Sequence, residues 1–146
     1  MRAEGLWHAA AAVLVLSGDG ERVYVHRRTD TKDVYPGLHD CTAGGVVAAG
    51  EDPARTAQRE VREELGVSSE VRFLFREVFT EGSVRYHAFV YVTRWDGPVR
   101  HQPAEVAEGW WMPVDELRER LADPRWPFVP DGRRFAERWL RERGHR

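Results

Sequence analysis

Runs of apolar residues predict four β-strands in the first two thirds of the chain. Residues 9–17 form an apolar run that ends at the turn Gly18-Asp19-Gly20, and residues 22–28 resume as a strand in hairpin order. Residues 71–79 and 84–95 are rich in β-branched and aromatic side chains, which favour strands. Because the last of these runs is long, we expect it to lie in the centre of a sheet.

Between the second and third of these strands, apolar residues recur at the spacing of an α-helix. Its apolar stripe consists of Ala54, Ala57, Val61 and Leu65. Pro53 fits the first turn of a helix, and Glu51 and Asp52 can cap it. Gly66 fits the left-handed residue that often follows the last helical turn. The pattern therefore predicts a helix from Pro53 to Leu65 with a buried side and an outer side.

The remaining pattern completes a mixed α/β order. Residues 41–52 mix short strand and turn elements, and residues 96–109 are rich in turn formers. Residues 110–114 predict a short strand, residues 115–121 a short helix, and residues 131–143 a last amphipathic helix. No linker, internal repeat or low-complexity tract divides the sequence, so we expect one domain over residues 1–146.

Composition narrows the classes of protein that this chain can represent. The 146 residues are 42% apolar and 32% charged, with a formal net charge of −2, which is typical of a folded soluble domain and not of a nucleic-acid-binding one. The longest apolar run, residues 9–16, is far shorter than the roughly 20 residues that span a membrane. Cys41 is the single cysteine, which excludes an internal disulfide and indicates a cytoplasmic protein.

Acidic side chains crowd one edge of the predicted helix. Glu60, Glu63 and Glu64 are spaced by three and four residues, so they converge beside the apolar stripe. Carboxylates this close repel one another unless a cation neutralises them, and a hard divalent ion such as Mg²⁺ prefers oxygen ligands. The alternative is a solvated helix face held by pairs such as Arg59 with Glu63. Glycines just before the helix favour the ion, because they let backbone groups approach a ligand.

The same segment resembles the Nudix signature. That signature is Gly, five residues, Glu, seven residues, then Arg-Glu-apolar-any-Glu-Glu-any-Gly-apolar. Here Gly45 and Glu51 are followed by the run Arg59 to Val67, and every fixed position matches. The resemblance implies an α/β/α sandwich with a mixed sheet and a catalytic strand-loop-helix, over about residues 7–143. It also implies a metal-dependent hydrolase that cleaves nucleoside diphosphates linked to another group.

The resemblance assigns roles to residues of this chain. Glu60 and Glu64 are similar to the main metal ligands, with Glu63 and the carbonyl of Gly44 as further ligands. The metal would be Mg²⁺, with Mn²⁺ as a possible substitute. Arg59 is expected to orient a glutamate through a bidentate contact, and Glu51 to approach the cluster from the loop. The general base is either a glutamate of this cluster or one in the loop around Glu105 and Glu108.

A finer resemblance lies outside the signature. The segments "HRRTDTKDVYPGLHDCTAGGVV" and "RWPFVPD" are similar to the branch that contains isopentenyl-diphosphate isomerase and the YfcD-type Nudix hydrolases. Five residues are thereby expected to contact a small phosphorylated substrate: Arg27, Arg28, Lys32, Arg85 and Trp126. A solvated strand end remains open for the first two, and a solvent-facing position for Arg85. The resemblance allows a homodimer, although no feature of the sequence requires one.

Two alternative functions come from the same resemblance. In the isomerase a cysteine occupies the position aligned with Gly44, whereas here Cys41 lies three residues earlier and no His-Pro follows. Cys41 is therefore expected to be a core residue and not an acid catalyst. The other alternative is a domain that binds a nucleotide without cleaving it. Such domains usually lack signature glutamates, all of which are present here.

Overall fold

The computed structural model describes residues 8–31, 35–81 and 84–143, and a mixed sheet forms its centre. Along the longest path the strands are ordered β3 (His39–Asp40), β2 (Arg22–Arg28), β1 (His8–Leu16), β6 (Val84–Arg94) and β5 (Arg72–Glu81). Two further strands extend it, with β4 (Thr42–Val46) pairing with β1 and β7 (Val106–Pro113) pairing with β2. Only β1 and β6 run parallel among these pairs, so the sheet is mixed as expected.

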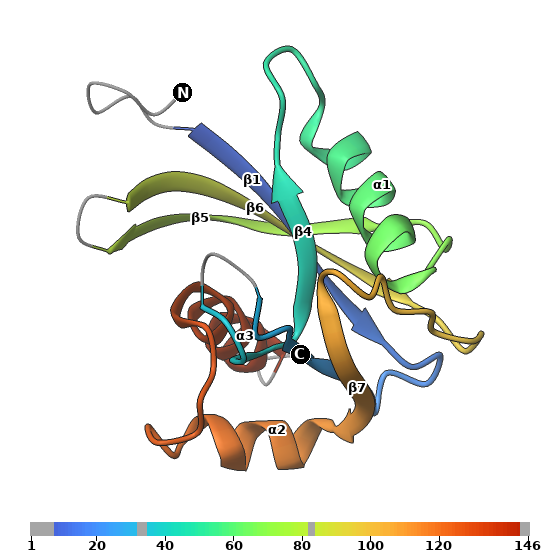
Figure 1. Ribbon diagram of the computed structural model, residues 1–146, viewed down its shortest axis with the longest axis vertical. Helices are drawn as coiled ribbons and strands as arrows, with labels where there is room; N and C mark the ends of the chain where they lie inside the picture. The colour runs from blue at the N-terminus through green and yellow to red at the C-terminus, as the bar shows by residue number, and fades with distance from the viewer. Residues whose placement is uncertain (1–7, 32–34, 82–83, 144–146) are drawn as a thin grey trace.

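Three helices cover the two faces of this sheet (Figure 1). Helix α1 (Pro53–Leu65) packs on one face, and α2 (Val114–Leu121) and α3 (Pro130–Arg143) pack on the other. The alternation of β1 explains the two layers, because Ala11, Val13 and Val15 face α1, whereas Leu14 and Leu16 face the core of α2 and α3. The α/β/α sandwich is therefore confirmed. None of the described helices is long and apolar enough to cross a membrane.

Helix α1 begins and ends where its local signals predict. The Asp52 side chain accepts a hydrogen bond from the Ala54 N–H at 3.1 Å, and Pro53 occupies the first turn. At the other end Gly66 has a φ of 72°, and its N–H donates to the Arg62 carbonyl. These two ends set the rotation of the helix, so that its apolar stripe is buried and its glutamates lie beside the sheet.

Other boundaries depart from the pattern. Strand β7 begins at Val106, within the segment predicted as a loop, because residues 106–113 pair with β2 along their length. The turn formers before Trp110 conceal this strand, since pairing with a neighbouring strand overrides their local preference. The expected hairpin partner of β1 is β2, but their register includes only Leu16 opposite Val23. The main antiparallel partner of β1 is β4.

Candidate active site

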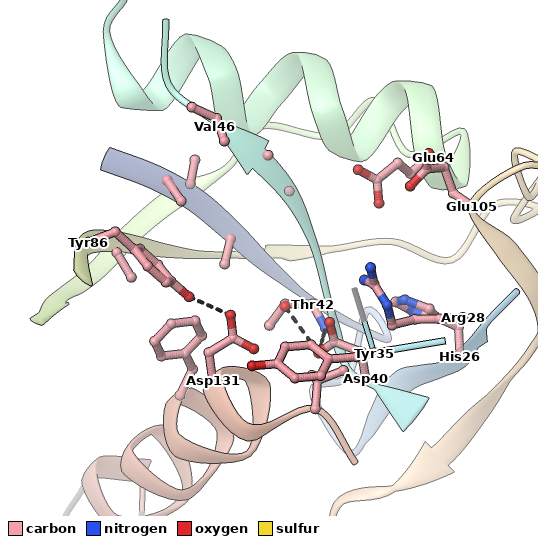
Figure 2. A pocket seen from close by; sticks show the side chains of 18 of the residues that line it. His26, Arg28, Tyr35, Asp40, Thr42, Val46, Glu64, Tyr86, Glu105 and Asp131 are labelled. Carbon is pink, nitrogen blue, oxygen red and sulfur yellow. Dashed lines mark hydrogen bonds between the residues drawn. The ribbon is translucent and has the colours of Figure 1, made fainter. Parts of the chain in front are cut away.

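A cavity of about 300 Å³ lies between the sheet, the end of α1 and the start of α3. Residues from β1, β2, β4, β6 and the segment at Glu105 line it as well. Figure 2 shows two ends to this cavity, with Glu64 and Glu105 at one end and Tyr86 and Asp131 at the other. Arg28 and His26, two residues apart on β2, lie below the glutamates in this view.

Glu60 and Glu64 lie one turn apart on α1 and share a hydrogen bond, and Glu64 lines the cavity. Burial raises the pKa of Glu64 to about 9, and the hydrogen bond and charge of Glu60 contribute next, followed by the charges of Glu105 and Asp40. A Cβ atom built on Gly45 would lie 3.0 Å from the carboxyl carbon of Glu60. The missing side chain of Gly45 therefore lets the Glu60 carboxylate approach the backbone of β4.

Arg59 connects two glutamates at the outer edge of this pair. Its Nη1 donates to the carboxylate of Glu51, and its Nη2 lies 3.6 Å from Oε2 of Glu60. The Thr56 hydroxyl donates to the other oxygen of Glu51 at 2.7 Å, and together with Arg59 it holds the pKa of Glu51 below its ordinary value. The expected bidentate contact with one glutamate is thus replaced by a bridge between two, Glu51 before the helix and Glu60 next to Arg59.

The donor groups at this end suit a hard divalent cation. Glu60 and Glu64 offer carboxylate oxygens, and Gly44 lines the cavity beside them on β4. Two neighbouring carboxyl groups next to a strand backbone match the oxygen preference of Mg²⁺ or Mn²⁺. Glu63 differs from Glu60 and Glu64 because its residue is exposed, whereas the other two are partly buried. Within the described ranges no three His, Cys, Asp or Glu side chains form a preassembled metal cluster.

Arg28 and Glu105 face the same cavity from β2 and from the segment before β7. The loop that carries Glu105 is tied to the end of α1, because the Arg100 N–H donates to the Leu65 carbonyl and the Gln102 N–H to the Glu64 carbonyl. The two neighbouring candidates lie outside the cavity. Arg27 instead donates to Glu108 at 2.9 Å, which engages both side chains with each other at the surface.

Two expected substrate contacts are corrected by the structure. Arg85 is exposed and does not line the cavity, because the alternation of β6 points Tyr86 and Ala88 toward it and Arg85 to the other face. Trp126 is also absent from the cavity wall, since its ring packs against His39 and Phe128 with the Arg120 guanidinium above it. Lys32, the remaining expected phosphate contact, lies outside the described residues.

Several cavity residues were not expected from the sequence. Tyr86 donates to Asp131 across the end of the cavity opposite Glu64, and Asp40 lies nearby. His26 is 4% exposed, and its Nδ1 has no hydrogen-bond partner in the described part of the chain. Burial, with the charge of Arg28 next, lowers the pKa of His26 to about 3. His26, Asp40 and Asp131 lie within the two motif segments quoted above, but no local signal marks these side chains individually.

Cys41 lies in the core, as expected. Its side chain is 2% exposed and packs with the residues of the α2 and α3 face, and it does not line the cavity. Burial raises the pKa of its thiol, with the charge of Asp40 contributing in the same direction. A Cβ atom on Gly44 would lie 1.8 Å from the carbonyl oxygen of Ala11, so the present backbone leaves no room for a cysteine there.

Comparisons with known proteins agree with this geometry. Residues 6–132 match the family model of the NUDIX domain. The chain is 52% identical over 139 residues to the uncharacterized Nudix hydrolase orf19 of Rhodococcus erythropolis, covering 88% of this chain and 75% of that protein. It is 36% identical over 143 residues to the uncharacterized Nudix hydrolase YfcD of Escherichia coli strain K12, covering 97% and 76%. The crystal structure of the MutT protein of Methanosarcina mazei Go1 shares the fold, with a TM-score of 0.77 at 22% identity over 94% of this chain and 95% of that one.

Proposed function

The chain belongs to the Nudix hydrolases, and we propose that it is a Mg²⁺-dependent enzyme that cleaves the diphosphate linkage of a nucleotide. Its substrate would be a nucleoside di- or triphosphate, or a nucleoside diphosphate linked to another moiety. One observation carries the proposal: Glu64 lines one end of a cavity that also contains Arg28 and Gly44, and Glu60 is hydrogen-bonded to Glu64 beside the glycine backbone of β4. Mn²⁺ is the expected substitute ion, and the reducing cytoplasm the expected compartment.

The metal-binding residues of this proposal are Glu60, Glu64 and the Gly44 carbonyl, with exposed Glu63 reached through water. When bound, the ion would neutralise phosphate charge and lower the pKa of a coordinated water molecule. Arg59 holds Glu60 through a contact of 3.6 Å and is itself held by Glu51, so the pair Arg59 and Glu51 positions a ligand and does not touch substrate.

Two other cavity residues would bind the substrate phosphate and accept the proton of the attacking water. Arg28 provides a guanidinium group that can donate two hydrogen bonds to phosphate oxygens. These oxygens carry the negative charge that develops when the diphosphate bond is cleaved. Glu105 lines the cavity at the same end as Glu64 and is the residue that we assign to accept the proton of the attacking water. Glu108 is excluded from this role because it is engaged by Arg27 at the surface.

The two alternatives are less well supported. The isomerase of the resemblance uses a cysteine as its acid, whereas Cys41 does not line the cavity here and burial raises the pKa of its thiol. A module that only binds a nucleotide has no need of the coupled carboxylates or of the Arg59 bridge. The hydrolase is therefore the function that these residues support best.

The test is a substrate screen with Mg²⁺ and with Mn²⁺. It should include nucleoside di- and triphosphates, pyrimidine nucleotides and isopentenyl diphosphate, with products separated by chromatography. We expect metal-dependent release of phosphate or diphosphate that is lost in Glu64→Gln and kept in Glu119→Gln, an exposed position on α2. Activity of the parent no higher than that of Glu64→Gln across the panel would refute the hydrolase.

A further inference from the structure

The cavity end opposite Glu64 and Glu105 is also acidic. Asp40 and Asp131 both line it, and Tyr86 and Tyr35 lie beside them (Figure 2). Phosphate would be repelled by these carboxylates, whereas the other end offers Arg28 and the proposed ion. A diphosphate-linked substrate therefore has one orientation in this cavity, with its diphosphate toward Glu64 and its other moiety toward Asp131.

The chain brings the two aspartates together through a long-range pairing. The His39 N–H donates to the Pro127 carbonyl at 2.8 Å, and the Val129 N–H donates to the His39 carbonyl at 2.9 Å. This pairing places the first turn of α3 against β3, so closely that a Cβ on Gly132 would lie 2.3 Å from Oδ1 of Asp40. The two carboxyl groups are thus held by backbone and not by flexible loops.

The hydrogen bonds of the aspartates leave acceptor capacity toward the cavity. Oδ1 of Asp40 accepts from the Cys41 N–H at 2.7 Å, the Thr42 N–H at 3.1 Å and the Thr42 hydroxyl at 3.2 Å. All three of these hydrogen bonds fall on Oδ1, and Asp40 is only 8% exposed. Asp131 accepts from Tyr86 on Oδ2 and from the Gly132 N–H on Oδ1, and each carboxylate oxygen has a second lone pair.

Buried acceptors of this kind call for a donor from the ligand. Burial, with the charge of Asp131 next, raises the pKa of Asp40 to about 7. An N–H group between the two carboxylates would compensate for the burial of Asp40 and for its repulsion by Asp131. A carbonyl oxygen in the same place would add to that repulsion.

Tyr35 adds an aromatic surface at the same end. Its φ of 53° is the one positive value on a non-glycine residue in the described part of the chain, and a bulky side chain rarely adopts it. Tyr35 lines the cavity, and its ring lies beside Asp40 and Asp131. The unfavourable backbone conformation of Tyr35 therefore occurs at a cavity position. A flat, aromatic moiety can stack there.

We propose that this end of the cavity, formed by Asp40, Asp131, Tyr86 and Tyr35, recognises a nucleobase that carries an exocyclic amino group. The inference rests on the proposed function, because it assumes a nucleotide whose diphosphate lies at the Glu64 end. Asp131 and Asp40 accept hydrogen bonds from the exocyclic amino group of the base, and Tyr35 stacks on its face. Bases with a carbonyl oxygen in place of the amino group are disfavoured.

The experiment compares pairs of nucleotides that differ by this group. GTP and ITP differ only by the 2-amino group, and CTP and UTP exchange an amino group for a carbonyl. For the parent protein we expect kcat/KM to favour GTP over ITP, and CTP over UTP, by about tenfold to hundredfold. In Asp131→Asn and Asp40→Asn these ratios should fall to about threefold or less, because the amide presents N–H to the base. Asn still offers an acceptor to Tyr86 and to the Thr42 N–H, so the fold should persist.

Matched variants separate recognition from general damage. Asp115→Asn, on the exposed start of α2, should keep the parent ratios. Tyr35→Ala should weaken all four nucleotides about equally, by about fivefold or more, and Tyr35→Phe should not. Equal rates for both members of each pair, or parent ratios retained in both aspartate variants, would overturn the proposal.

A binding measurement distinguishes this inference from the proposed function. Titration calorimetry of Glu64→Gln with GDP and IDP reports base preference without catalysis. If no nucleotide is hydrolysed yet GDP binds at least about tenfold more tightly than IDP, the hydrolase fails and the recognition site stands. If nucleotides are hydrolysed without discrimination, the recognition site fails alone.

Discussion

Gly45 and Glu60 are in contact across the gap between β4 and α1, with 3.0 Å between a Cβ built on Gly45 and the carboxyl carbon of Glu60. That separation is shorter than ordinary van der Waals contact, so any side chain at position 45 must displace the carboxylate. The first glycine of the signature therefore sets the position of a proposed metal ligand fifteen residues later.

Gly45→Ala should accordingly impair metal-dependent hydrolysis more than folding. Displacement of the Glu60 carboxylate by a few tenths of an ångström is expected to lower kcat/KM by about tenfold to hundredfold and to raise the metal concentration needed for half-maximal rate. Thermal denaturation should change by only a few degrees. Ala49→Gly changes one methyl group on the exposed turn after β4 and should keep the parent rate. An unchanged metal titration in Gly45→Ala would show that Glu60 is not a ligand.

Gly44, the adjoining residue, should respond in the opposite way. A Cβ there would lie 1.8 Å from the Ala11 carbonyl oxygen, which is part of the backbone and cannot rotate aside. We expect Gly44→Ala to lower the free energy of unfolding by about 1–3 kcal/mol, measured by urea denaturation. Gly44→Cys should be destabilised in the same way and should not isomerise isopentenyl diphosphate. A Gly44→Ala protein as stable as the parent would mean that β4 can shift away from β1.

The bridge made by Arg59 predicts a difference between arginine and lysine. One guanidinium contacts Glu51 and Glu60 with separate nitrogens, and a lysine ammonium cannot span both. Arg59→Lys should therefore lower kcat/KM by about tenfold to hundredfold and raise the metal requirement, with KM for the nucleotide nearly unchanged. Arg62→Lys, three residues later and exposed, is the matched control and should behave as the parent. A rise in nucleotide KM alone would instead place Arg59 in contact with substrate.

The sequence predicts best those features that depend on near neighbours. Helix α1 is recovered from Pro53 to Leu65 because its capping residue, its proline and its terminal glycine act within one turn. The approach of Glu60 to Glu64 follows from a spacing of four on that helix. Cys41 is likewise correctly expected in the core, since an isolated cysteine is usually buried.

Features that depend on distant pairing are not visible in the pattern. The approach of Asp131 to Asp40 requires residues 127–129 to join β3, which is only two residues long. Arg85 and Tyr86 differ by one position on β6, and only the helix packed on each face decides which of them reaches the cavity. Trp126 is held by His39 from the same distant pairing, so its position could not be deduced from its own segment.

Two buried groups give the stability of the protein opposing dependences on pH. Burial raises the pKa of Asp40 from 3.8 to about 7 in the folded state, so the folded state binds a proton that the unfolded state has released. Its contribution is full below pH 3.8 and is lost as the pH rises toward 7. Burial lowers the pKa of His26 from 6.5 to about 3, so its contribution is full above pH 6.5 and is lost as the pH falls toward 3.

Between about pH 4 and 6.5 the pH dependences that Asp40 and His26 give to the free energy of unfolding cancel. A variant that removes one of the two groups should therefore show the pH dependence of the other. At about 1.4 kcal/mol for each pH unit, the difference between pKa 3.8 and about 7 amounts to on the order of 4 kcal/mol. Asp40→Asn should therefore gain stability over the parent as the pH rises from 4 to 7, and its unfolding free energy should climb steeply with pH. The free energy of unfolding of His26→Gln should instead decrease as the pH rises over the same range. Urea denaturation at half-unit pH steps, in the presence of a chelator, measures both curves. Parallel curves for the parent and Asp40→Asn would show that Asp40 titrates normally in the folded protein.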